Sequence, residues 1–248
     1  MGCKIVAIAH GKSEVIMLSE IGSRMRVNLE VFDRSGGEEA IKLEHIGPML
    51  SADPFDSEAS LKRRYPKLDY LPKGPVRMPD LRIYPVMDRD GDIPRVGSYM
   101  SGDMFSKSGF RSRIIPILNI DSLDTVVEEC GYGPIRNKVK DYRRMFATAD
   151  LQEFYRRTVD NPRTNMDVFL YECMRTRPPF QGRIANGEIV APKGIDLSLL
   201  RKRSAVIGVG IIGYCGILKT RCLKPDASPD ASSFVAGQLN QRSMVHRP

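Results

Sequence analysis

The fold is decided by the stretch Leu-Arg-Ile-Tyr-Pro-Val-Met-Asp-Arg-Asp-Gly-Asp at residues 81–92. A mostly apolar run ends in three alternating carboxylates, Asp88, Asp90 and Asp92. Open α/β sheets place ligands at the carboxyl ends of their strands, so we expect a buried strand that delivers acids to a binding edge. Binding of a divalent cation that prefers oxygen ligands, such as Mg²⁺, would relieve the repulsion between these acids. A calcium loop is excluded because its sixth position is Ile93 rather than glycine, which leaves a polar surface turn as the alternative.

Strand and helix patterns alternate before this stretch. Residues 3–9 form a short apolar run rich in β-branched residues, which predicts a buried strand. Ser13 can cap a helix after it. Residues 27–32 predict a second strand and residues 38–50 a second helix. This order is typical of a parallel sheet with right-handed crossovers.

Residues 51–80 interrupt the alternation with five prolines and few periodic apolar positions. We expect an irregular insertion there, either an ordered excursion or a long loop at the rim of the sheet. Its basic cluster, Lys62-Arg63-Arg64, is either a solvated face or a contact with a phosphate backbone.

The residues after the acidic stretch continue the α/β pattern. Residues 95–110 suit a loop or a broken helix, residues 114–120 another apolar strand, and residues 123–130 a helix. Pro85 and Pro116 fall within the two predicted strands. Because proline cannot donate a ladder hydrogen bond, one of these strands is expected at an edge or bulged.

From residue 138 onward, helices replace the alternation. Residues 138–159 and 165–175 have helical patterns, and the first carries basic residues, including Arg143 and Arg144, among aromatic ones. Such interleaving suits a nucleic-acid face. The alternative is an amphipathic helix whose aromatic side chains belong to the core.

The last fifty residues combine an apolar run and a polar tail. Residues 205–218 are shorter than the roughly 20 residues of a membrane span. Their glycines make a poor dinucleotide motif because no acid follows at the required distance. We expect a buried strand or a glycine-packed helix there. The composition of residues 224–248 predicts a disordered tail.

The overall composition favours a cytoplasmic protein with anionic partners. The formal charge is +8, with a pI of about 9.3. Five scattered cysteines without a paired spacing argue for reduced thiols and against zinc. We expect no signal peptide and no membrane association.

In the predicted sheet, two turns share the carboxyl edge: one after residues 3–9 and one after Met87. A glycine turn that opens a helix favours an anion at the helix N-terminus. Acids opposite that turn would hold a metal that neutralises charge and activates water. The pair therefore suits a phosphodiester and its metal, and the turns read His10-Gly11-Lys12-Ser13-Glu14 and Asp88-Arg-Asp90-Gly-Asp92.

These motifs resemble those of the Toprim domain, in which one strand is followed by Glu-Gly-x-x-Glu/Asp and a later strand by Asp-x-Asp. Type IA and type II topoisomerases, bacterial primases and nucleases of phage-defence systems share that fold. The resemblance covers roughly residues 3–135. It departs from the family at His10, which stands where the first glutamate is expected, whereas Glu14 matches the second acidic position.

The resemblance implies a role for each motif residue. Mg²⁺, or Mn²⁺ in its place, would be held by Asp88 and Asp90, with Asp92 and Glu14 assisting. Either His10 or Glu14 would position or deprotonate the attacking water. The implied catalytic set is thus His10, Glu14, Asp88 and Asp90, and the phosphate-binding set is Gly11, Lys12 and Ser13. The basic patterns described above add a nucleic-acid-binding set of Lys62, Arg63, Arg64, Arg143 and Arg144.

We therefore expect a Toprim-like α/β fold with an open, mainly parallel sheet flanked by helices. It would span residues 1–135, followed by a mainly helical basic extension at 136–223 and the tail. The favoured function is Mg²⁺-dependent nuclease cleavage of DNA or RNA. The resemblance implies a phage-defence setting and leaves a partner ATPase and the oligomeric state open. The alternatives are a non-catalytic module that binds nucleic acid or a partner, and a small-nucleotide phosphohydrolase or transferase.

Overall fold

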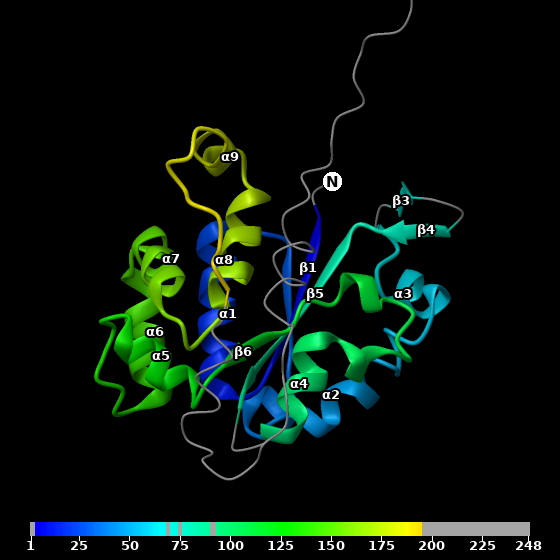
Figure 1. Ribbon diagram of the computed structural model, residues 1–248, viewed down its shortest axis with the longest axis horizontal. Helices are drawn as coiled ribbons and strands as arrows, with labels where there is room; N and C mark the ends of the chain where they lie inside the picture. Colours follow the sequence, from blue (N-terminus) through cyan, green and yellow to red (C-terminus); the bar gives the residue numbers. More distant parts are fainter. Residues whose placement is uncertain (1–2, 68–69, 74–75, 90–92, 195–248) are drawn as a thin grey trace, which may run out of the picture. The chain divides into compact units, whose positions relative to one another are not determined.

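A parallel four-stranded sheet forms the centre of the fold. The computed structural model describes residues 3–67, 70–73, 76–89 and 93–194. The strand order is β2-β1-β5-β6, and every neighbouring pair is parallel. Helices lie on both sides of the sheet, and the C-terminal part of the described chain is helical (Figure 1). The predicted open α/β sheet with a helical C-terminal region is thus confirmed. The strands are β1 (Lys4–Ala9), β2 (Leu29–Phe32), β5 (Leu81–Asp88) and β6 (Ile117–Asn119).

The strand register brings three carboxyl ends together. The central strand β1 is fully buried from Ile5 to Ala9, as expected of a parallel strand covered on both faces. Ala9 lies opposite Val86 of β5, and Asp88 lies opposite Asn119 of β6. The turns that follow β1, β5 and β6 therefore share one edge of the sheet.

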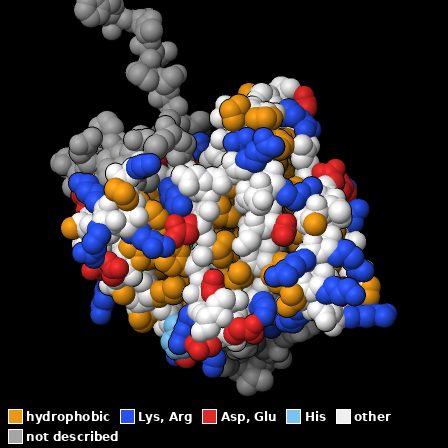
Figure 2. Space-filling model, turned by 180° about the vertical axis from the view of Figure 1, so that it is seen from behind, with side chains coloured by type: hydrophobic (Ala, Val, Ile, Leu, Met, Phe, Trp, Pro, Cys, Tyr) orange, Lys and Arg blue, Asp and Glu red, His pale blue; other side chains and the backbone are white. Residues whose placement is uncertain are grey.

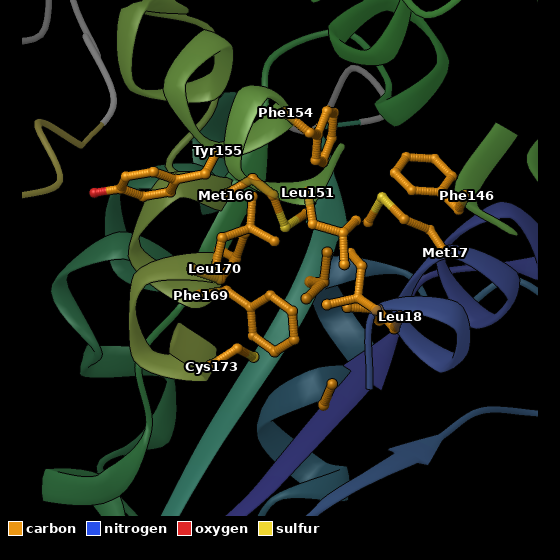
Figure 3. Close-up of a cluster of buried hydrophobic side chains, with 14 of the residues drawn as sticks. Met17, Leu18, Phe146, Leu151, Phe154, Tyr155, Met166, Phe169, Leu170 and Cys173 are labelled. Atoms are coloured by element: carbon orange, nitrogen blue, oxygen red, sulfur yellow. The ribbon is translucent and has the colours of Figure 1, made fainter. Parts of the chain in front are cut away.

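One face of the sheet carries most of the hydrophobic core. It is covered by α1 (Lys12–Met25), α5 (Leu123–Glu129), α6 (Lys138–Thr148), α7 (Leu151–Asp160) and α8 (Met166–Arg175). Figure 3 shows Met17 and Leu18 of α1 beside aromatic side chains from the later helices, including Phe146 and Phe169. The C-terminal helices thus share a core with the sheet. A further helix, α9 (Pro178–Ala185), follows α8.

The opposite face packs against α2 (Leu43–Met49) and α4 (Ile93–Ser101) (Figure 1). The buried Tyr99 hydroxyl lies 2.6 Å from the carbonyl oxygen of Pro85 and 2.9 Å from that of Ile117, so it donates its proton between two neighbouring strands. The prediction that one of the two proline-containing strands lies at an edge is confirmed by β6, which begins directly after Pro116. The other strand, β5, is central and accommodates Pro85.

The outer edge of β6 is completed by a segment much later in the chain. The backbone N–H of Leu118 donates to the Asn165 side-chain oxygen at 2.7 Å, and the Asn165 amide donates to the Pro116 carbonyl oxygen at 2.8 Å. The N–H of Ile120 donates to the carbonyl oxygen of Arg163 at 2.7 Å. The connection between α7 and α8 therefore satisfies backbone groups that an edge strand would otherwise leave open.

Three predicted segments differ from the structure. The helix expected over 38–50 is confined to α2, because the residues before it are extended: Glu39 forms an antiparallel bridge with Arg34, and the Ile41 N–H donates to the His10 carbonyl oxygen at 2.8 Å. The insertion 51–80 contains regular elements: α3 (Glu58–Arg64) and an antiparallel pair, β3 (Tyr70–Lys73) and β4 (Val76–Pro79). The helix expected over 138–159 is divided at Asp150, whose carboxylate accepts the N–H groups of Gln152 and Glu153 and so starts α7.

The predictions for residues 205–218 and 224–248 lie outside the described residues. Within the described part of the chain, none of the helices combines the length and apolar character required to cross a membrane.

Candidate functional site

The two motif turns meet at the carboxyl edge of the sheet. The backbone N–H of His10, just after β1, donates to the Val86 carbonyl oxygen of β5 at 3.1 Å, and Asp88 ends β5 two residues later. The structure therefore places the start of one motif beside the start of the other. Asp90 and Asp92 lie outside the described residues.

His10 is held against the segment that precedes α2. Its Nδ1 lies 2.9 Å from the Ile41 carbonyl oxygen, and its own carbonyl oxygen accepts the Ile41 N–H at 2.8 Å. A carbonyl oxygen only accepts, so Nδ1 carries the proton and Nε2 is the acceptor nitrogen of the neutral ring. The residue is buried, which fixes this orientation.

Glu14 is a buried acid in the first turn of α1, only 2% exposed. Its Oε2 accepts the backbone N–H of Gly11 at 3.0 Å. Burial raises the pKa of Glu14 from 4.5 to about 7, against the lowering effect of its backbone hydrogen bonds; nearby Asp124 raises it and Lys138 lowers it. Near neutral pH this carboxyl group is therefore able to take up and release a proton.

Asp88 is oriented by a chain of buried hydrogen bonds. Its Oδ1 accepts the side-chain amide of Asn119 at 3.0 Å and the backbone N–H of Leu123 at 2.9 Å. The Asn119 side-chain oxygen in turn accepts the Thr164 hydroxyl at 2.7 Å. Asn119 and Thr164 are fully buried, so the rotation of the Asp88 carboxylate is set by three separate parts of the chain.

Asp124 of α5 links the first motif to α6. Its Oδ1 accepts the Tyr142 hydroxyl at 2.8 Å and lies 3.5 Å from the Ser13 hydroxyl, while its Oδ2 lies 2.9 Å from the Lys138 ammonium. The hydrogen bond to Asp124 is the main cause of a raised Lys138 pKa, and the charges of Glu14 and Asp88 add to it. Three carboxylates and one ammonium group therefore interact at this edge.

Sequence reasoning missed the partners that organise this cluster, namely Asn119, Asp124 and Tyr142. The first two carried a weak signal, because they fall at the end of a predicted strand and at the start of the next predicted helix. Tyr142 lay within the basic and aromatic helix, where its partner was not evident. Its burial and the nearby Asp124 raise the pKa of its hydroxyl far above the ordinary range.

The described residues do not by themselves form a metal site. Among them, no group of three or more histidine, cysteine, aspartate or glutamate side chains is placed to hold an ion. The carboxylate oxygens of Asp88 suit a hard cation such as Mg²⁺. A complete site would therefore need Asp90 or Asp92 in addition.

The predicted phosphate-binding residues make contacts within the chain. Lys12 forms an ion pair with Glu38, the Gly11 N–H binds Glu14, and Ser13 lies beside Asp124. These contacts tie the first motif to its surroundings, so a phosphate would have to compete with them.

The predicted nucleic-acid-binding residues divide into two groups. On α3, Lys62, Arg63 and Arg64 pair with Glu58, Asp53 and Glu30, respectively. On α6, Arg143 and Arg144 are exposed, and Arg144 pairs with Asp141. Figure 2 shows basic and acidic side chains interspersed over one face of the molecule, not a continuous basic surface.

Comparison with known proteins gives no match: no protein-family model, no curated protein and no solved structure is significantly similar to the chain. The Toprim resemblance therefore remains a hypothesis that rests on the two motifs and their placement.

Proposed function

We propose that the chain is a Toprim-like nuclease that hydrolyses phosphodiester bonds of DNA or RNA with Mg²⁺. The observation that carries this proposal is the placement of two buried acids at one carboxyl edge: Glu14, whose pKa is raised by burial to about 7, and Asp88, which Asn119 and Leu123 orient. A general base works best when its pKa lies near the working pH. The +8 charge favours a polyanionic substrate.

In this proposal each group at the edge has one task. Glu14 takes a proton from the attacking water or returns one to the leaving oxygen. Asp88, with Asp90 and Asp92, would hold Mg²⁺, which when bound neutralises phosphate charge and lowers the pKa of water. Lys138, which pairs with Asp124 and feels the charges of Glu14 and Asp88, offsets negative charge when a phosphate enters. A phage-defence setting and a partner ATPase follow from the resemblance alone.

The test is a degradation assay with the full chain. Plasmid DNA, single-stranded DNA and RNA are incubated with Mg²⁺, Mn²⁺ or EDTA. We expect cleavage of a polymer that requires the metal, and a loss of about a hundredfold or more in Glu14→Gln because general acid–base catalysis contributes 10²–10⁴-fold. Asp88→Asn should lose activity as well, while its amide oxygen still accepts the Leu123 N–H.

Glu20→Gln is the matched control, since Glu20 lies on the same helix and its side chain is only partly buried. It should cleave like the unaltered chain. Unchanged cleavage in Asp88→Asn would show that the site is wrongly assigned. Hydrolysis of nucleoside triphosphates without cleavage of any polymer would favour the small-nucleotide enzyme instead.

A second candidate is a binding module without catalysis, and one observation favours it. Glu14 and Asp88 each accept a backbone N–H at the start of a helix, and His10 is fixed by Ile41. These hydrogen bonds therefore stabilise the fold whether or not the site is catalytic. Tight binding of nucleic acid without cleavage in Mg²⁺ or Mn²⁺ would favour the binding module over the nuclease.

A further inference from the structure

Arg89 lies at the carboxyl edge of the sheet with a buried guanidinium group that pairs with Asp121. It follows Asp88 directly, and its backbone N–H donates to the Asn119 carbonyl oxygen at 3.1 Å, which extends the pairing of β5 with β6 by one residue. Only 8% of Arg89 is exposed. A cation is rarely buried to this extent unless acceptors surround it.

The guanidinium group of Arg89 has more N–H groups than hydrogen-bond acceptors around it. Its Nη2 donates to Asp121 at 2.9 Å. Its Nε and Nη1 are shielded from solvent and have no hydrogen-bond partner among the residues that the structure describes. Buried N–H groups without an acceptor are costly, so each one in a native structure calls for an explanation, and an ion or a functional role is among those that apply.

Asp121, the acid that pairs with Arg89 among the residues that the structure describes, is shared. The other oxygen of Asp121 lies 2.7 Å from Arg163, which also pairs with Glu129 at 3.2 Å. Asp121 therefore divides its charge between two guanidinium groups. The Nε and Nη1 groups of Arg89 therefore require a further acceptor.

We propose that Arg89 forms an oxyanion-binding site in which Nε and Nη1 bind the oxygens of a phosphate group. The site lies at the carboxyl ends of neighbouring parallel strands, where α/β sheets bind their ligands. Arginine–phosphate hydrogen bonds are charge-assisted and therefore strong. This inference rests on the proposed function in one respect, that the phosphate belongs to the nucleic-acid substrate.

The test measures binding without turnover. The ¹H–¹⁵N resonance of the Arg89 Nε–H group, assigned through its own backbone, is followed in EDTA while inorganic phosphate or a short oligonucleotide is added to the full chain. We expect a saturable shift of this resonance with either probe. In Arg89→Lys, which retains the charge but lacks both nitrogens, the affinity for phosphate should fall at least tenfold.

Arg156→Lys is the control, because Arg156 pairs with one acid, Glu153, at the surface and should not affect binding. Absence of a shift in the unaltered chain would overturn the site, even if Arg89→Lys failed to fold. A shift with inorganic phosphate but not with the oligonucleotide would overturn its assignment to the nucleic-acid substrate. Since EDTA prevents metal-dependent turnover, phosphate binding at Arg89 would stand even if no hydrolysis were ever found.

Discussion

The raised pKa of the buried Glu14 predicts how the free energy of unfolding changes with pH. In the folded chain the pKa of Glu14 rises from 4.5 to about 7, mainly because the carboxylate is desolvated. Between these two pH values the folded state binds more protons than the unfolded state, so stability falls as the pH rises. Since a pKa difference of one corresponds to about 1.4 kcal/mol, the full effect of Glu14 is about 3 kcal/mol at pH 8.

Glu14→Gln removes this penalty and retains an oxygen for the Gly11 N–H. We expect the variant to be more stable than the unaltered chain by up to about 3 kcal/mol at pH 8, with little difference at pH 4. The measurement is urea unfolding of both proteins from pH 4 to pH 8 at constant ionic strength.

The comparison between variants isolates Glu14 from the other groups that titrate. Glu20→Gln should follow the pH dependence of the unaltered chain, because Glu20 lies on the same helix without being fully buried. If the difference between Glu14→Gln and the unaltered chain were the same at every pH, the raised pKa of Glu14 would be refuted.

Four further substitutions test the framework of the site by chemical unfolding. Thr164→Val should cost about 1–3 kcal/mol, because the buried Asn119 oxygen loses its donor; no loss would contradict the proposed chain of hydrogen bonds. Gly36→Ala should cost about 1–2 kcal/mol through its positive φ alone, and Gly37→Ala clearly more, since its Cβ would meet the backbone of α1; equal effects would argue against that contact. Tyr99→Phe should cost about 1–3 kcal/mol through the two strand carbonyls that it serves, and a neutral result would count against the shared hydrogen bond.

Local patterns were sufficient to predict the sheet. The buried strands β1 and β5 are almost uninterrupted apolar runs, and Ser122 marks the start of α5 by accepting the Thr125 N–H. The same patterns predicted that His10 and Asp88 lie at one edge of the sheet, because the carboxyl ends of parallel strands share an edge. The long helix expected over 38–50 failed for a non-local reason: the Ile41 N–H donates to the His10 carbonyl oxygen, 31 residues earlier, which keeps the backbone before α2 extended.

The partners of the site could not be predicted from local patterns. Asn119 binds Asp88 across 31 residues, and Thr164 binds Asn119 across 45. Asp124 became part of the site only through the packing of α5 and α6 against α1. Sequence spacing does not contain such contacts, because they depend on how the helices cover the sheet.

The late completion of β6 has a consequence for synthesis of the chain. The ribosome releases β6 before the residues that satisfy its outer edge, since Leu118 bonds to Asn165, 47 positions later. Until that segment emerges, the strand offers open N–H and C=O groups to any neighbouring chain. A nascent or truncated product that stops at residue 135 would thus expose an unpaired strand edge that favours aggregation. It would also lack the Thr164 hydroxyl that donates a hydrogen bond to Asn119. Assembly of this carboxyl edge must wait until the chain has been translated as far as Asn165.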